Sequence, residues 1–306
     1  MDALVLKSTG SWYQVETLDG TILEARIRGK FRLVEKDISN PIAVGDLVRI
    51  EEDPNFEDTA RIVEIYNRKN YIIRKSNKLS SKRQILASNL DLGLMVASLV
   101  APSTSRGFID RFLACCEAYH IPAAIFFNKT DLLEDDGIEL SLDMAKEYSD
   151  LGYTTFVGSA TTGHGSDKLK AFLFNKTTLL AGHSGVGKST LLNKLYPESL
   201  AKVGAISKTH LKGKHTTTFA QMYVTDKTRI IDTPGIRDFG LVDIVKQELA
   251  HTFPEFRHHM SACKFNDCLH INEPECAVKN AVEQQTINPE RYYSYLSMYH
   301  NEDSFN

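Results

Sequence analysis

The spacing of apolar and polar residues along this 306-residue chain changes character near residue 75. Before that point, short alternating runs typical of half-buried strands are separated by turn dipeptides such as Asp19-Gly20 and Asn40-Pro41. The runs cover residues 4–6, 12–15, 22–27, 46–50 and 60–65. Five short strands in this length predict a small β-barrel such as an OB-fold, although an SH3-like barrel or a purely structural β domain has the same pattern.

From about residue 89, apolar runs alternate with segments of helical spacing. Strands are expected at 92–100, 123–127, 154–157 and 177–181, and helices at 108–120, 142–151, 168–174 and 190–195. The first of these helices collects four apolar residues on one face: Ile109, Phe112, Leu113 and Cys116. The alternation predicts a parallel sheet covered by helices, which binds ligands at the carboxyl ends of its strands.

The final part of the chain loses this alternation and holds a cysteine cluster followed by a helical, tyrosine-rich tail. The chain length suits two or three domains. We therefore expect a multidomain protein, with a β-barrel at 1–75, an α/β domain at 76–245 and a helical domain at 246–306.

One octapeptide has the chemistry of a phosphate-binding loop: Gly182-His183-Ser184-Gly185-Val186-Gly187-Lys188-Ser189. Its glycines allow backbone N–H groups to face phosphates, Lys188 supplies charge to the β- and γ-phosphates, and the Ser189 hydroxyl ligates Mg²⁺. A strand precedes the loop, and the helix that begins near Thr190 adds its positive N-terminal end. The segment is predicted to bind a nucleoside triphosphate.

A second phosphate-sensing motif, Asp232-Thr233-Pro234-Gly235, follows a strand about forty residues later. Asp232 is predicted to hold Mg²⁺ through water, and the Gly235 N–H to sense the γ-phosphate. Between the two motifs, Thr217 or Thr218 is expected to bind the γ-phosphate in the GTP state only, with Thr217 placed among the Mg²⁺ ligands. The alternatives are a plain turn for the tetrapeptide and the start of a strand for the threonines. The predicted catalytic set is Lys188, Thr217, Thr218, Asp232 and Gly235.

Base choice is predicted from Asn128-Lys129-Thr130-Asp131, which precedes the phosphate loop. The Asp131 carboxylate can accept two hydrogen bonds from the guanine edge, whereas adenine offers no matching pair of donors. Asn128 is expected to tie the loop together, the Lys129 stem to cover the base, and Ser159-Ala160 to supply a second guanine loop. In an ordinary GTPase the guanine loop comes near the end of the domain. The inverted order predicts a circularly permuted GTPase.

The hydrolytic machinery is incomplete at one position. Signalling GTPases place a glutamine directly after the motif that corresponds to Asp232–Gly235, where it orients the attacking water. This chain has Ile236 at that position. We therefore expect slow intrinsic hydrolysis that needs a partner or another residue. His215 is a candidate for that role, and a contact to an RNA phosphate is the alternative for it.

Three cysteines and a histidine close together predict a structural zinc site formed by Cys263, Cys268, His270 and Cys276. The alternative is three buried free thiols and one surface histidine. Cys115 and Cys116 lie in an apolar helical pattern and are expected to be packing residues.

The net charge of −3 gives no indication of a nucleic-acid partner, but the distribution of charge does. Residues 68–83 hold seven basic and no acidic side chains, and a second basic run spans 202–215. Each run alone suits a solvated surface, whereas two beside a nucleotide switch favour a phosphate-rich partner. No apolar run reaches the ~20 residues of a membrane span, and the N-terminus lacks the features of a signal peptide. A cytoplasmic monomer is the default expectation.

The combination of a small barrel, the permuted motifs and the segment CKFNDCLHINEPEC resembles the RsgA (YjeQ/YloQ-type) ribosome biogenesis GTPases along essentially the whole chain. The resemblance implies an OB-fold, a permuted GTPase domain and a zinc-binding domain. It also implies binding to the small ribosomal subunit and 16S rRNA late in maturation, GTPase stimulation by that subunit, and release after hydrolysis to GDP. Asp243 stands where some family members have a histidine proposed to assist hydrolysis, and Gly185 stands where potassium-dependent GTPases have asparagine.

Two other function classes fit the residues. One is a GTPase that acts on another RNA such as tRNA. The other is a nucleotide-gated RNA-binding adaptor with little hydrolysis, which Ile236 permits.

Overall fold

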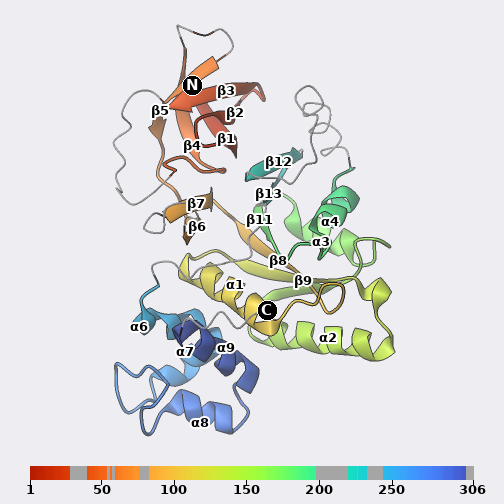
Figure 1. Ribbon diagram of the computed structural model, residues 1–306, viewed down its shortest axis with the longest axis vertical. Coiled ribbons are helices and arrows are strands. Elements are labelled where there is room, and N and C mark those ends of the chain that lie inside the picture. The colour runs from red at the N-terminus through yellow and green to blue at the C-terminus, as the bar shows by residue number, and fades with distance from the viewer. Residues whose placement is uncertain are drawn as a thin grey trace.

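The computed structural model of the protein describes residues 1–27, 40–53, 56, 59–75, 83–197, 220–225, 227–232 and 244–300. Within these ranges the chain forms a β-barrel, a central sheet with helices on both faces, and a group of C-terminal helices (Figure 1). The three parts follow one another along the longest axis of the molecule, with the central sheet in the middle (Figure 1).

The N-terminal barrel is closed by five strands: β1 (Asp2–Ser8), β2 (Tyr13–Thr17), β3 (Ile22–Ile27), β4 (Leu47–Glu52) and β5 (Thr59–Ile65). They pair in the order β1-β2-β3-β5-β4, and β4 returns to β1. Alternate side chains point inward, so Val5, Val15 and Ile62 are fully buried in one apolar cluster. The predicted barrel is confirmed.

A hairpin that the sequence pattern did not predict follows the barrel. It consists of β6 (Tyr71–Lys75) and β7 (Arg83–Ser88). The fully buried Asp46 carboxylate joins the hairpin to the barrel, because it accepts the Ser88 hydroxyl at 2.5 Å and the Arg68 guanidinium at 2.7 Å. Arg68 therefore has a structural partner, although it opens the first basic run.

The central sheet has the order β10-β9-β8-β11-β13-β12. Its strands are β8 (Leu92–Ser98), β9 (Ala123–Asn128), β10 (Thr154–Val157), β11 (Thr177–Ala181), β12 (Gln221–Thr225) and β13 (Thr228–Asp232). All are parallel except β12, which runs antiparallel and also pairs with β1 through Lys7 and Gln221. One continuous ladder of strands therefore links the barrel to the central sheet.

Helices cover both faces of the central sheet. On one side, α1 (Arg106–Ala118) and α2 (Asp135–Asp150) pack into one apolar cluster, and on the other α3 (Ser166–Leu173) and α4 (Lys188–Leu195) pack into a second. The predicted α/β layering is confirmed. The helix α2 begins well before residue 142, where we expected it, because its first turn carries acidic side chains that the helix dipole favours.

The C-terminal part is helical. It contains α6 (Lys246–Leu249), α7 (Pro254–Met260), α8 (Ala277–Glu283) and α9 (Pro289–His300), with short 3₁₀ turns such as η2 (Ala250–Thr252). Phe253, Phe256 and Tyr295 form its buried aromatic centre. No helix among the described residues is both long and apolar enough to span a bilayer.

Candidate functional site

The predicted nucleotide-binding residues that the structure describes gather at the carboxyl ends of neighbouring parallel strands. Asn128 ends β9, Ser159 follows β10, Gly182 follows β11, and Asp232 ends β13. Because these strands run in parallel, their carboxyl ends lie along one edge of the sheet. The sheet therefore brings together segments that are far apart in sequence. Along the chain, the guanine loop precedes the phosphate loop.

The Asn128 carboxamide joins two of these segments directly. Its Nδ2 donates to the Val186 carbonyl at 2.8 Å, and its Oδ1 accepts from the Ala160 N–H at 2.8 Å. The side chain is almost fully buried, so both polar ends are satisfied away from water. One side chain thus fixes the phosphate loop and the Ser159-Ala160 loop relative to each other.

The other residues of the guanine loop continue this arrangement. Lys129 has a left-handed backbone, with φ of 68°, and its ammonium donates to the carbonyls of Ala101 and Gly185. The Thr130 N–H donates to the Gly158 carbonyl at 3.2 Å, and Asp131 is exposed. An exposed carboxylate can accept hydrogen bonds from a ligand that enters from solvent.

The Ser159 hydroxyl organises the adjacent loop. It is fully buried and accepts from the N–H groups of Thr161 at 3.2 Å and Thr162 at 3.1 Å. The loop is therefore held by hydrogen bonds of its own, which reduces the entropy lost on binding.

Two glycines of the phosphate loop have no room for a side chain. Gly187 has φ of 101°, and a Cβ there would lie 2.4 Å from Asn128 Nδ2. Gly182 has φ of 139°, and a Cβ there would lie 2.3 Å from the Val96 carbonyl oxygen. By contrast Ser184, Ser189 and Thr190 are exposed. The loop packs tightly against its neighbours and presents its hydroxyl groups outward at the start of α4.

Lys188 and Asp232 form the charged centre of the site. The Lys188 ammonium donates to the carbonyls of Gly182 at 2.6 Å and His183 at 2.8 Å. Burial lowers the pKa of Lys188, and the charge of Asp232 opposes that shift. Burial also raises the pKa of Asp232, and Lys188 opposes it in turn. The two groups stabilise each other's ionised form.

The donor set fits a hard divalent cation. Asp232 Oδ1 is buried and has no hydrogen-bond partner among the described residues, so it has unused acceptor capacity beside the phosphate loop. Carboxylate and hydroxyl oxygens are ligands that Mg²⁺ prefers. The positions of Thr217, Thr218 and Gly235, together with His215 and Ile236, lie outside the described residues.

The three cysteines and the histidine of the predicted zinc site come together in the C-terminal part. Their ligand atoms all lie within 4.8 Å of one another. Cys263 Sγ lies 3.9 Å from Cys276 Sγ, and His270 Nδ1 lies 3.6 Å and 3.3 Å from these two sulfurs. Tetrahedral zinc with Zn–S bonds of about 2.3 Å places its sulfurs about 3.8 Å apart, so the cluster has the right size to hold a metal ion.

Residues that the sequence did not single out support this cluster. The Glu273 carboxylate accepts from the N–H groups of Leu269 at 2.8 Å and Ile271 at 2.9 Å, on either side of His270. The Tyr292 hydroxyl donates to the His270 carbonyl at 2.7 Å. Burial lowers the pKa of His270, although Glu273 opposes this, and the shift favours the neutral imidazole that can ligate a metal. The tyrosine-rich tail was the one sequence feature that could have indicated these supporting contacts, because Tyr292 belongs to it.

Sequence reasoning also missed the segment between β8 and α1. Its Ala101 carbonyl accepts from Lys129, and its Pro102 ring lies close to the phosphate loop, since a Cβ added at Gly185 would lie 3.3 Å from Pro102 Cδ. Nothing local in the sequence marks these contacts, because both partners come from distant loops.

Comparison with known proteins agrees with this geometry. A family model for the RsgA GTPase matches residues 65–242, and a model for the RsgA N-terminal domain matches residues 3–58. A Bacteroides fragilis protein named small ribosomal subunit biogenesis GTPase RsgA is 49% identical over 299 residues, which cover 97% of this chain and 96% of that protein.

Two solved structures share the fold. The crystal structure of YjeQ from Thermotoga maritima is 33% identical with a TM-score of 0.77, and the match covers 98% of this chain and 97% of that one. The structure of YloQ, described as a circularly permuted GTPase, is 31% identical with a TM-score of 0.72, covering 98% and 94% of the two chains. The predicted circular permutation is confirmed.

Proposed function

This chain belongs to the RsgA GTPase family, and we propose that its hydrolysis of GTP serves the biogenesis of the small ribosomal subunit. It is a GTP hydrolase. The name of its Bacteroides fragilis relative supports the assignment to the small subunit. The observation that carries the proposal within the molecule is the Asn128 carboxamide, which holds the guanine loop against the phosphate loop.

We assign the guanine to the exposed end of the site. The Asp131 carboxylate accepts hydrogen bonds from the guanine N1–H and N2–H₂ groups, and the loops containing Asn128-Lys129-Thr130 and Ser159-Ala160 frame the base. Adenine lacks this pair of donors, which gives the preference for GTP. The same assignment places the phosphates over Gly182 to Thr190, where successive backbone N–H groups and the start of α4 attract negative charge.

The phosphate end carries the chemistry. Lys188 leaves the carbonyls of Gly182 and His183 and moves its ammonium to the β- and γ-phosphates. We assign Ser189, Asp232 and Thr217 to Mg²⁺, which when bound neutralises charge on the phosphate oxygens. Thr218 and Gly235 complete the proposed γ-phosphate contacts. Because Ile236 cannot orient water, we propose that the small subunit completes the hydrolytic site.

We propose Zn²⁺ as the metal of the C-terminal cluster. Four protein ligands leave no open position for substrate, so its role is structural. With zinc in this cluster, we propose three domains: a barrel at 1–75, a permuted GTPase domain at 76–245 and a zinc-binding domain at 246–306. We further propose that the protein is a cytoplasmic monomer and that it contacts the 16S rRNA of the small subunit.

Single-turnover hydrolysis of GTP tests the function. The rate is measured with the protein alone, with purified small subunits and with bulk tRNA at equal nucleotide concentration. We expect strong acceleration by small subunits only. Acceleration by tRNA instead would identify another RNA as the partner, and a rate that neither RNA changes would support a nucleotide-gated adaptor.

Salt dependence tests the proposed rRNA contact. An interface that neutralises several phosphates loses affinity steeply as salt rises, because it releases condensed counterions on binding. We therefore expect binding to the small subunit, measured by co-sedimentation, to weaken steadily from low to physiological salt. A salt-insensitive affinity would count against contact with rRNA phosphates.

A further inference from the structure

The helix α1 is buried on both sides and belongs to two domains at once. One face packs on the central sheet through Phe108, Phe112 and Leu113. The other face turns toward the C-terminal helices, where Ala114 packs in the same apolar cluster as Phe253. In Figure 1, α1 lies between the sheet and the C-terminal helices α7 and α9. A movement of the C-terminal domain would therefore displace side chains that pack directly against α1.

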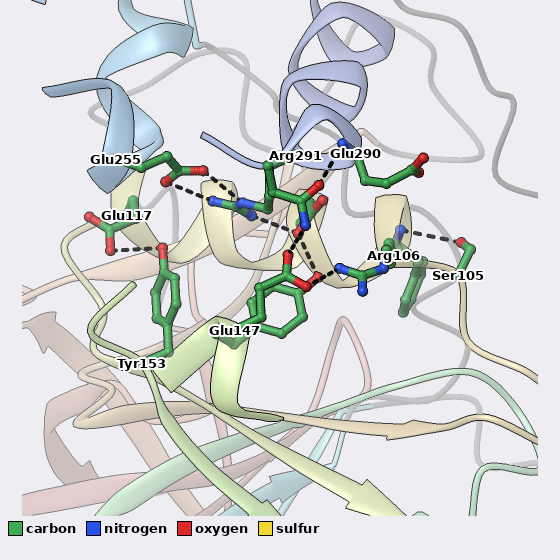
Figure 2. A network of polar contacts seen from close by, with 12 residues as sticks. Ser105, Arg106, Glu117, Glu147, Tyr153, Glu255, Glu290 and Arg291 are labelled. Atoms are coloured by element: carbon green, nitrogen blue, oxygen red, sulfur yellow. Dashed lines mark hydrogen bonds and ion pairs between the residues drawn. The ribbon is translucent and has the colours of Figure 1, made fainter. Parts of the chain in front are cut away.

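A buried ion-pair network fixes this second face. Arg291 of α9 donates to Asp110 of α1 at 2.6 Å and to Glu255 of α7 at 2.8 Å and 3.2 Å. Figure 2 shows the Arg291 guanidinium reaching toward Glu255 on one side and toward α1 on the other. The Tyr148 hydroxyl of α2 donates to the same Asp110 oxygen at 2.8 Å. Only 2% of the Arg291 side chain is exposed, so the charges are desolvated and leaving one unpaired is costly.

Two further contacts hold α1 at its ends. At its first turn, Arg106 pairs with Glu147 at 2.6 Å (Figure 2). Glu147 also accepts from Asn288, just before α9, at 2.6 Å. At its last turn, Glu117 pairs with Arg257 of α7 at 2.9 Å, and this pair is partly exposed, unlike that of Arg291 with Asp110. The buried contacts therefore concentrate near the start of α1.

That start is also the part of α1 that meets the phosphate loop. Phe108, two positions from Asp110, stacks on His183 with ring centres 3.8 Å apart and planes at 26°. The His183 carbonyl accepts from Lys188. The segment that leads into α1 contacts Lys129 through Ala101. The Arg291–Asp110 pair and the Phe108–His183 stack are thus joined through the first turns of α1, in a line from the C-terminal domain to the phosphate loop.

We propose that Asp110 and Phe108 are positioning residues, through which the C-terminal domain sets the geometry of the phosphate loop by way of α1. The inference rests on the proposed role of that loop in binding GTP. Because coupling between two sites is reciprocal, a partner that shifts the C-terminal domain changes nucleotide affinity, and bound nucleotide changes the affinity for that partner.

A double-mutant cycle between the two ends of the line tests this proposal without any ribosomal subunit. Affinities for fluorescent GDP and GTP are measured for the wild type, Arg291→Met, His183→Ala and the double variant. We expect Arg291→Met to weaken nucleotide binding at least about fivefold, the lower end of common coupling factors, and the double variant to be no weaker than the weaker single one. Unchanged affinity in Arg291→Met, or effects that multiply independently, would overturn the proposal.

Matched variants separate positioning from loss of fold. Arg257→Gln removes an ion pair across the same interface, at the end of α1 away from the phosphate loop, and is expected to leave nucleotide affinity unchanged. An equal loss in that variant would show a general effect of domain docking and overturn the proposal. His183→Phe keeps a ring on Phe108 and is expected to restore the coupling that His183→Ala removes.

A conservative variant covers the case in which Arg291→Met does not fold. Asp110→Asn keeps the shape of the side chain and removes its charge, and metal content and thermal unfolding verify that it is folded. It is expected to lower nucleotide affinity while metal content stays at the wild-type level. Lys188→Ala is measured in parallel: normal GTP binding in that variant would contradict the assigned nucleotide site, whereas an uncoupled cycle contradicts only the role of α1.

Discussion

The two hydrogen bonds of the Asn128 carboxamide span 58 and 32 residues of chain, and both are buried. At the scale of single residues, the site depends on such side chains more than on the groups that face the ligand. The motifs indicate which residues carry chemistry, because a carboxylate, an ammonium or a thiol is visible in the sequence. They do not indicate a stack such as that of Phe108 on His183, because neither ring carries a local signal of its partner.

Replacing Asn128 with alanine is expected to weaken GDP and GTP binding at least tenfold. The change leaves the Ala160 N–H and the Val186 carbonyl without partners, and each buried unsatisfied group costs roughly 1–3 kcal/mol. Titration with a fluorescent nucleotide measures the effect. Asn280→Ala, at an exposed position in α8, serves as the matched control and should bind normally. Equal affinities for both variants would show that Asn128 does not organise the site.

Replacing Asp232 with asparagine is expected to abolish hydrolysis without lowering the unfolding temperature. Burial raises the pKa of Asp232, so the ionised form costs folding free energy at every pH above the folded pKa. The cost disappears below the ordinary pKa of a carboxyl group, where both folded and unfolded forms are protonated. At neutral pH the neutral amide should therefore unfold at the same temperature or higher. A clear drop in that temperature would contradict the burial argument.

At the scale of elements, local patterns located most strands and helices. Barrel strands such as β2 alternate between apolar and polar residues, and β8 and β9 are almost uniformly apolar, which is sufficient to predict them. The hairpin of β6 and β7 was missed because its short apolar pairs flank a basic run that reads as a solvated loop. The early start of α2 was missed because its first turn is acidic rather than apolar.

The phosphate loop gives a prediction at this scale. Gly187→Ala and Gly152→Ala both place a side chain at a positive φ, 101° and 95° respectively, and this backbone conformation alone costs each variant roughly 1 kcal/mol of stability. Only the Gly187 variant meets a neighbour, Asn128 Nδ2 at 2.4 Å, whereas Gly152 has open space. Nucleotide binding should fail in Gly187→Ala and persist in Gly152→Ala. Retained binding in the first would mean that the loop tolerates displacement of Asn128.

At the scale of the whole molecule, the sequence does not show how the parts meet. The pairing of β1 with β12 and the ion pair of Arg291 with Asp110 join segments separated by more than a hundred residues. Long-range pairing of this kind leaves no periodic pattern, so only the order of the motifs was predictable. That order was sufficient to predict the circular permutation.

The metal cluster gives a prediction for the C-terminal domain. We expect one Zn²⁺ per chain, measured by elemental analysis, and its loss in Cys276→Ser. Because Cys268 and Cys276 belong to the apolar cluster of this domain, metal loss should expose α7 to α9 to protease while the barrel stays resistant. Cys115→Ala, in the buried face of α1, should keep the metal. Full metal content in Cys276→Ser would exclude this ligand set.

The most direct test of the central claim is the nucleotide specificity of Asp131→Asn. An asparagine amide can donate to the C2 carbonyl of xanthine and cannot accept the two guanine donors. If the loop before the phosphate loop reads the base of the same nucleotide, this variant will lose affinity for GTP and gain affinity for XTP, as measured by competition against a fluorescent nucleotide. An unchanged preference for GTP would show that Asp131 does not read the base, and would contradict the account.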